Sequence, residues 1–172
     1  MPVRTPRSRP PRSSARRVLP GLVVSLVLAT VLVGCGGVSQ EDFAADANEV
    51  CASFSTWSAG KQESFRDALA TGDEGAAAAL LIEYERRFDR TLEKIDSLEA
   101  PDDDADRRAI DRFLTVGRQQ ADLLPDLAAA IEAGDLAELE DLSDEGEDLE
   151  VKLGRAARAY DLVDCASGPV QA

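Results

Sequence analysis

Histidine is absent from this 172-residue chain, and lysine occurs only three times. Because histidine is the commonest general base and a leading metal ligand, its absence excludes Ser-His-Asp and Cys-His catalysis, H-E-x-x-H zinc sites and histidine-ligated haem. The chain has no C-x-x-C pair, which disfavours a redox role for its cysteines. No stretch alternates apolar and polar residues for long enough to indicate a β-sheet. We therefore expect a helical protein without enzymatic activity and without a cofactor.

Residues 1–34 have the composition of an export signal. Six arginines lie among prolines and serines, and an apolar run follows over residues 18–33. A positive segment, a short apolar segment and a small-residue cleavage site are typical of a secretory signal peptide. The apolar run is shorter than the roughly 20 residues of an ordinary spanning helix. The alternative is an uncleaved N-terminal anchor, and both interpretations place the rest of the chain outside the cytoplasmic membrane. The pair Arg16-Arg17 leaves the export route open.

The apolar run ends in Leu32-Val33-Gly34-Cys35, which resembles the lipobox of bacterial lipoproteins. In that motif Leu, a small or branched residue, and Gly or Ala precede a cysteine that is lipidated and becomes the new N-terminus. The resemblance implies that residues 1–34 are a cleaved signal peptide. It also implies that Cys35 carries the lipid anchor, which includes a palmitate chain. It also implies that the protein sits on the extracytoplasmic face of the cell membrane.

A chain that begins at Cys35 has a formal net charge of −20, because six positive charges and no negative ones are removed from a total of −14. This charge disfavours nucleic acid and anionic lipid headgroups as partners, since each approach would meet repulsion. It permits basic proteins or divalent cations. The simpler role for the acidic residues is to solvate the outward faces of helices.

Four amphipathic segments follow a short tether over residues 35–39. Apolar residues recur at intervals of three and four in each of them, which predicts helices. Gly-Asp pairs at 72–73 and 134–135 supply a helix-ending glycine followed by an N-capping acid, as in a tight turn between antiparallel helices. We expect an all-α, up-down-up-down four-helix bundle over residues 40–165 and a C-terminal tail over 166–172. The expected helices cover about 40–71, 74–100, 102–133 and 135–165.

With Cys35 assigned to the lipid, Cys51 and Cys165 remain, and an exported protein normally pairs two such cysteines. The proposed topology puts the start of the first helix and the end of the fourth at the same end of the bundle. We therefore predict a disulfide between Cys51 and Cys165. The alternative is two buried thiols.

The lengths of the helices complicate this pairing. At about 1.5 Å per residue, Cys51 lies about 30 Å from the first Gly-Asp turn, whereas Cys165 lies about 45 Å from the second. A continuous fourth helix would therefore carry Cys165 past its partner. Three adjustments remain open: a restart of the fourth helix near 143–146, a tilt of the third helix at Pro125, or a folding back of the last residues.

Acidic clusters are the candidate metal ligands. The first cluster, which begins at Asp102, has the acidic residues of a calcium-binding loop. However, the sixth position of such a loop is Arg107 instead of Gly, and the twelfth position is Phe113 instead of Glu. Acids at a helix N-terminus are explained by capping and by the helix dipole. The second cluster has no better spacing, so we predict no metal site. The clusters are Asp102, Asp103, Asp104 and Asp106, and Asp144, Glu145, Glu147, Asp148 and Glu150.

The aromatic residues after Cys35 fall on or beside the predicted inner faces of the helices, which favours a role in the core. A ligand cavity lined by some of them is conceivable if Gly60, Gly117 and Pro125 leave the bundle imperfectly closed, and it would favour apolar guests. These aromatics are Phe43, Phe54, Trp57, Phe65, Tyr84, Phe88, Phe113 and Tyr160.

The whole chain looks like the small helical lipoproteins of high-GC Gram-positive, actinobacterial bacteria. The likeness rests on the lipobox, on Ala47-Asn48-Glu49-Val50-Cys51 and on Tyr160-Asp161-Leu162-Val163-Asp164-Cys165, where Asp161 replaces a common Gly. The resemblance implies a disulfide-closed bundle with no catalytic residues to carry over.

Two functions fit these observations. The leading hypothesis is a non-enzymatic, membrane-anchored binding or interaction module of the cell envelope, held to the membrane through the lipid on Cys35 and able to meet an envelope protein partner. The alternative is a carrier or sensor of a small apolar ligand within the bundle, which predicts an internal cavity. An enzyme would require a convergent carboxylate site in a cleft.

Overall fold

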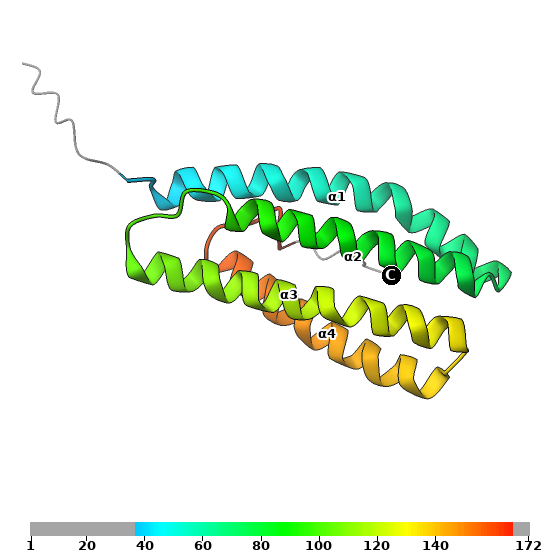
Figure 1. Ribbon diagram of the computed structural model, residues 1–172. Helices are drawn as coiled ribbons and strands as arrows, with labels where there is room; N and C mark the ends of the chain where they lie inside the picture. The colour runs from blue at the N-terminus through cyan, green and yellow to red at the C-terminus, as the bar shows by residue number, and fades with distance from the viewer. Residues whose placement is uncertain (1–36, 167–172) are drawn as a thin grey trace, which may run out of the picture. The chain divides into compact units, whose positions relative to one another are not determined.

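The computed structural model describes residues 37–166, and their regular structure is entirely helical, with no strand (Figure 1). The helix α2 packs against both α1 and α3, and α3 packs against α4. The predicted all-α class is confirmed. The expected signal peptide, the lipobox with Cys35 and all of the expected tail over 166–172 except Ala166 lie outside the described residues. The helices are α1 (Gln40–Thr71), α2 (Glu74–Asp96), α3 (Asp104–Ala133) and α4 (Leu136–Arg158).

Both Gly-Asp connections have the geometry that their sequence predicts. Gly72 and Gly134 adopt φ of 70° and 64°, the left-handed region that glycine enters without steric cost. Asp73 and Asp135 then cap α2 and α4, because each carboxylate accepts a hydrogen bond from the backbone N–H three residues further on. Each pair thus ends one helix and starts the next with almost no intervening chain.

The first acidic cluster starts α3. The Asp103 carboxylate accepts hydrogen bonds from the backbone N–H groups of Ala105 and Asp106, and Arg107 forms an ion pair with Asp102 at 3.2 Å. Helix capping and charge pairing therefore account for this cluster. Within residues 37–166 the structure contains no group of three or more Asp, Glu or Cys side chains placed to hold a metal ion.

The end of α4 corrects a prediction. The sequence suggested a helix that continues to about residue 165, but α4 ends at Arg158. The Leu162 N–H donates to the Ala157 carbonyl at 2.9 Å, and Asp161 has a φ of 57°. This bond and the left-handed residue reverse the chain, as in a Schellman turn. An Asp therefore stands where the backbone favours Gly.

The folded-back segment resolves the mismatch in helix length. The helix α4 is unbroken over residues 143–146, so a restart there is not the explanation. The helix α3 runs as one element through Pro125. Tyr160 just before the left-handed residue and Leu162 just after it are buried, with 2% and 0% of their surface exposed. The segment after α4 is thus part of the core, and it carries Cys165 back toward α1.

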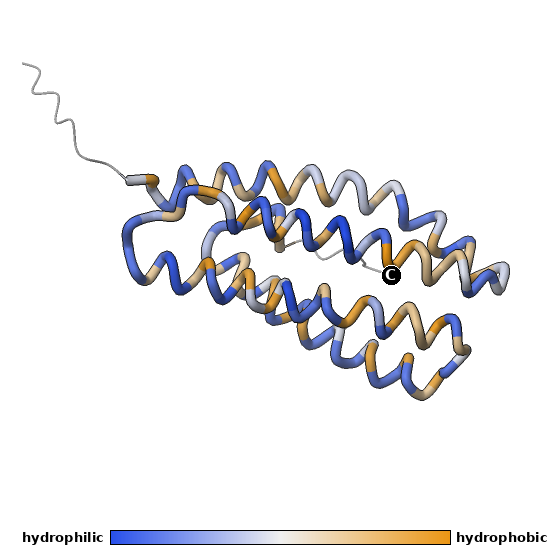
Figure 2. Tube along the Cα trace, in the orientation of Figure 1, coloured by the Kyte–Doolittle hydropathy of each residue, from blue (hydrophilic) through white to orange (hydrophobic). Residues whose placement is uncertain are grey.

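The core lies where the helices meet. Figure 2 shows apolar residues interspersed with polar ones along each helix, the pattern of helices with one buried face. Phe43 near the start of α1 meets Tyr160 edge to face, with ring centroids 5.9 Å apart. The centre of the core consists of large side chains with no more than 2% of their surface exposed: Phe43, Leu92, Ile95, Phe113, Leu114 and Leu162.

Candidate functional site

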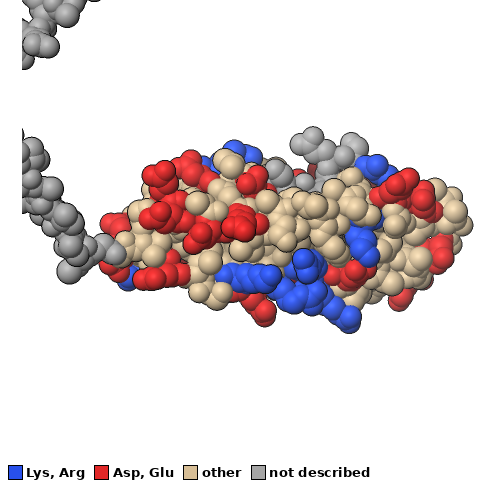
Figure 3. Space-filling model, turned by 90° about the horizontal axis from the view of Figure 1, so that it is seen from above, with Lys and Arg blue, Asp and Glu red and all other residues tan. Residues whose placement is uncertain are grey.

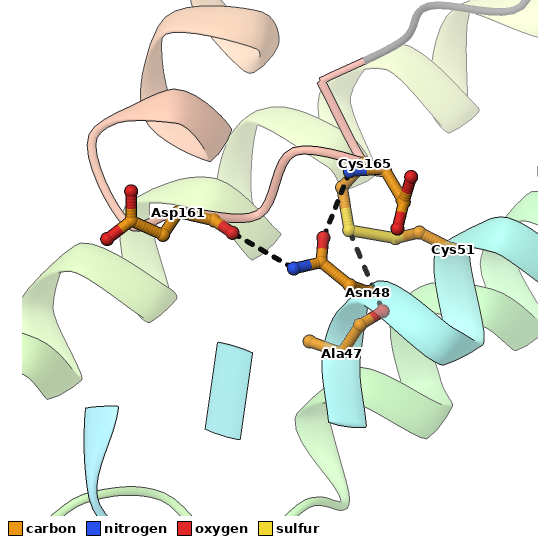
Figure 4. The surroundings of a disulfide bond; sticks show 6 residues. Ala47, Asn48, Cys51, Asp161 and Cys165 are labelled. Carbon is orange, nitrogen blue, oxygen red and sulfur yellow. Dashed lines mark hydrogen bonds between the residues drawn. A yellow bond between two sulfur atoms is a disulfide. The ribbon is translucent and has the colours of Figure 1, made fainter. Parts of the chain in front are cut away.

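The segment after α4 is held to α1 by a disulfide and by one asparagine (Figure 4). The sulfur atoms of Cys51 and Cys165 lie 2.03 Å apart, so the predicted pair is at disulfide distance. The Asn48 side chain donates to the Asp161 carbonyl at 2.9 Å and accepts from the Asp164 N–H at 3.0 Å. These two bonds satisfy backbone groups that the reversed chain leaves outside any helix.

An aromatic cluster lies beyond this junction along α1 and α2. Phe54 contacts Tyr84 edge to face, with centroids 5.1 Å apart, and contacts Phe88 at 5.3 Å. Trp57 lies 6.0 Å from Tyr84. Such offset and edge-to-face pairs are favourable beyond the area that they bury. The cluster fixes the ring of Tyr84 between the two helices.

An apolar pocket of about 110 Å³, here called the outer pocket, opens beside this cluster between three helices. Lys61 is one of the lining residues, and its ammonium group forms an ion pair with Glu83 at 3.0 Å. Aromatic and leucine side chains supply most of the wall. The lining residues are Ser58, Lys61, Gln62 and Phe65 of α1, Leu80, Leu81 and Tyr84 of α2, and Leu124 of α3.

A second cavity of about 30 Å³, here called the inner cavity, lies within the bundle. Tyr84 is the one residue that lines both spaces. Gln120 of α3 also lines the inner cavity, as do Cys51 and Cys165. The inner cavity therefore joins the aromatic cluster to the disulfide junction.

Two residues that line the inner cavity each carry a buried polar atom with no hydrogen-bond partner among the described residues: the Tyr84 hydroxyl and the side-chain carbonyl oxygen of Gln120. An unsatisfied buried donor or acceptor costs about 1–3 kcal/mol, and such groups are uncommon in folded proteins. One is a donor and the other is an acceptor. A hydroxyl group has both complementary capacities, because it can accept a hydrogen bond from Tyr84 and donate one to Gln120.

The hydroxyl of Tyr84 stays protonated at any ordinary pH. Burial, and to a smaller extent the negative charge of Glu150, raises the pKa of Tyr84 well above its usual value near 10. Tyr160, the other tyrosine, has its pKa raised to about 12, mainly by burial and then by the charge of Asp106. Tyr84 therefore offers a neutral donor and no phenolate base.

These shifts predict an alkaline titration in which neither tyrosine ionises near pH 10 while the protein is folded. The chain has only two tyrosines, so the ultraviolet absorbance of phenolate reports both. In denaturant both should titrate near pH 10. Because the unfolded chain then binds fewer protons than the folded one, the free energy of unfolding is undiminished below pH 10 and falls as the pH rises above it. A native-state curve centred near pH 10 would contradict the burial of both hydroxyl groups.

The sequence identified part of this site. It placed Phe65 and Tyr84 on inner faces and allowed a cavity near three helix-breaking residues. Gly117 does not open the bundle, because a Cβ there would lie 2.7 Å from a methyl carbon of Leu92. Sequence reasoning missed Gln120, although it lies three residues after Gly117 and four before Leu124, beside the apolar stripe of α3. That spacing was the available signal.

Comparisons with models of protein families, with curated proteins and with solved structures gave no match to this chain. Over residues 37–166, no helix combines the length and the apolar character needed to cross a membrane. The functional argument is therefore built from the two cavities and from the chemistry of the residues that line them.

Proposed function

We propose that this protein is a lipid-anchored lipoprotein of the cell envelope that binds a small, largely apolar molecule between α1, α2 and α3 and catalyses no reaction. The export and anchoring part of the proposal rests on the motif that ends at Cys35. Membership of the small helical lipoproteins of high-GC Gram-positive bacteria belongs to the same proposal. The up-down-up-down arrangement of the helices is also part of the proposal. It is supported by the two Gly-Asp connections and by the packing of successive helices.

The observation that carries the proposal is the unpartnered Tyr84 hydroxyl beside an apolar pocket. A protein gains no stability from leaving this donor and the Gln120 carbonyl unsatisfied. A bound molecule that forms hydrogen bonds with both groups removes this free-energy cost, and the removal contributes to its binding affinity. This favours a ligand-binding role over a module that acts only through its outer surface.

The size of the outer pocket limits the ligand. An engineered apolar cavity of about 150 Å³ binds benzene, and the outer pocket has a volume of about 110 Å³ with one open side. A single ring or a short branched chain therefore fits. Its apolar body would contact Phe65, Leu81 and Leu124.

The two unpartnered atoms specify the polar end of the ligand. A hydroxyl group can accept a hydrogen bond from the Tyr84 hydroxyl and donate one to the Gln120 carbonyl oxygen. A ligand whose body fills the outer pocket and whose hydroxyl reaches past Tyr84 into the inner cavity satisfies both. The proposed ligand class is therefore a small phenol or a compact apolar alcohol.

The residues at this site support binding without catalysis. The raised pKa of Tyr84 disfavours its action as a general base, because the phenolate form is not populated at neutral pH. Lys61 is occupied by Glu83. The remaining wall is apolar or carries neutral hydroxyl and amide groups.

The test compares phenol with toluene, which has a similar shape and no hydroxyl. A ligand at ten times its Kd stabilises the folded state by about 1.4 kcal/mol, so phenol should raise the Tm of the purified protein. Because toluene leaves both polar atoms unpaired, it should bind about tenfold more weakly.

Two matched variants locate the effect. Tyr84→Phe should remove the preference for phenol over toluene, and it should not destabilise the unliganded protein, because it removes an unsatisfied donor. Tyr160→Phe makes the same chemical change at a buried residue that lines neither cavity, and it should keep the preference. Equal stabilisation of the unsubstituted protein by phenol and toluene, or by neither, would refute the proposed ligand class.

A further inference from the structure

A second groove lies between α1 and α2 and shares no residue with the outer pocket. It has a volume of about 110 Å³. Figure 3 shows several Lys and Arg side chains gathered along the lower edge of one face, with Asp and Glu side chains spread over much of the rest of it. We call this space the cationic groove. Its lining residues are Val50, Ser53 and Phe54 of α1 and Arg87, Arg90, Thr91 and Lys94 of α2.

Three positive charges converge on the cationic groove. Arg87, Arg90 and Lys94 follow one another at helical intervals of three and four, so they lie along one side of α2. Within residues 37–166, none of the three forms an ion pair with Asp or Glu, although the chain has 33 acidic residues. In contrast, the cations at Lys61 and Arg118 are paired. Like charges at this spacing repel, and the nearby Glu85 carboxylate interacts with Arg90 without forming an ion pair with it.

The groove is partly organised in advance. The guanidinium carbon of Arg87 lies 5.9 Å from the centre of the Trp57 ring, and the Lys61 ammonium lies at the same distance. A cation over an aromatic ring is attracted to it, so Trp57 restrains Arg87 at the end of the groove. The Ser53 side chain adds a hydroxyl donor to the wall.

We propose that the cationic groove binds a phosphate group. Arginine presents a planar fork of donors that matches the oxygens of phosphate, and lysine adds a point charge. A phosphate monoester carries about −1.5 to −2 charge at neutral pH. It therefore neutralises three cations more completely than a single carboxylate, with a charge of −1, would. The chain as a whole is strongly acidic, so the three cations make the groove a local region that attracts phosphate.

The phosphate can come from a soluble phosphate ester or from a lipid headgroup, and both present the same group to Arg87, Arg90 and Lys94. The proposal does not depend on the site at Tyr84. The cationic groove favours an anion, whereas the apolar outer pocket favours an uncharged molecule. The two sites can therefore be tested separately.

The experiment titrates the full chain with inorganic phosphate at constant ionic strength and follows the line width of the phosphorus NMR signal. A second arm measures sedimentation of the protein with vesicles that contain phosphatidic acid, compared with vesicles of phosphatidylcholine alone. Arg90→Gln removes one groove cation. Arg86→Gln removes the same charge from the neighbouring turn of α2 without touching the groove wall.

Binding through the groove predicts that Arg90→Gln weakens the interaction about tenfold or more, as expected for a lost charge-assisted hydrogen bond. Arg86→Gln should change it by much less. A response to inorganic phosphate identifies a soluble source, and a response to phosphatidic acid vesicles alone identifies a headgroup. The proposal is overturned if neither phosphate source binds, or if the two variants weaken binding equally.

Discussion

Removing the disulfide between Cys51 and Cys165 should lower the free energy of unfolding by about 4–5 kcal/mol. The two residues are 114 positions apart, and a crosslink that closes so long a loop restricts the unfolded chain strongly. Domains of this size are stable by only about 5–15 kcal/mol. The disulfide therefore supplies a large share of the stability of the fold.

Urea unfolding with and without a reducing agent measures this effect, since the midpoint and slope give the free energy of unfolding. The double variant Cys51→Ala/Cys165→Ala should match the reduced protein, and a reducing agent should not affect it. The hydrogen bonds of Asn48 remain in both cases, so the folded-back segment should stay in place. A loss below about 1 kcal/mol would show that the crosslink does not restrict the unfolded chain as this argument requires.

Truncating the largest buried side chain of α3, by Phe113→Ala, should lower the free energy of unfolding by about 3–5 kcal/mol. Phe113 has 2% of its surface exposed and packs in one cluster with Leu92 and Ile110. Its removal loses buried apolar area and leaves a cavity that the unbroken helices cannot close fully. The expected effect is thus the second largest among our predictions.

A matched control is available on α4. Val151 has 55% of its surface exposed, so Val151→Ala should change the free energy of unfolding by no more than about 0.5 kcal/mol. Both variants are compared by urea unfolding under the same conditions. If Phe113→Ala cost as little as Val151→Ala, the centre of the bundle would not lie between α2 and α3 where the structure places it.

Much of the fold was predictable because its signals are local. Apolar spacing gave the four helices, and the glycine and aspartate of each connection gave the helix ends at Gly72 and Gly134. The expectation that the chain is exported, together with the two cysteines that remain after Cys35, predicted the pairing of Cys51 with Cys165. Each of these inferences needs only neighbouring residues or a count.

The end of α4 was not predictable from the same signals. No glycine or proline marks residue 158, and Asp161 takes the left-handed conformation despite its side chain. The turn is stabilised by distant contacts, because Tyr160 packs on Phe43 and Asn48 bonds to the backbone of Asp161. Tertiary packing therefore overrides the helical pattern that continues toward Cys165.

The candidate site was predictable only in part. Helical spacing placed Tyr84 and Phe65 on inner faces, which is correct. Whether the Tyr84 hydroxyl finds a partner depends on how far α2, α3 and α4 stand from one another, and a single sequence does not contain that distance. The same limit applies to the cationic groove, where the net charge of −14 hides a local excess of positive charge.

The location of bound phenol tests the central claim most directly. Intermolecular nuclear Overhauser effects between phenol protons and the assigned side chains of the purified protein measure it. Our account predicts contacts from the phenol ring to Phe65, Leu81 and Tyr84. At the same phenol concentration, the contacts to Phe65 and Leu81 should weaken in Tyr84→Phe but not in Tyr160→Phe. Contacts confined to other residues, or contacts that persist unchanged in Tyr84→Phe, would contradict a ligand site built around the Tyr84 hydroxyl.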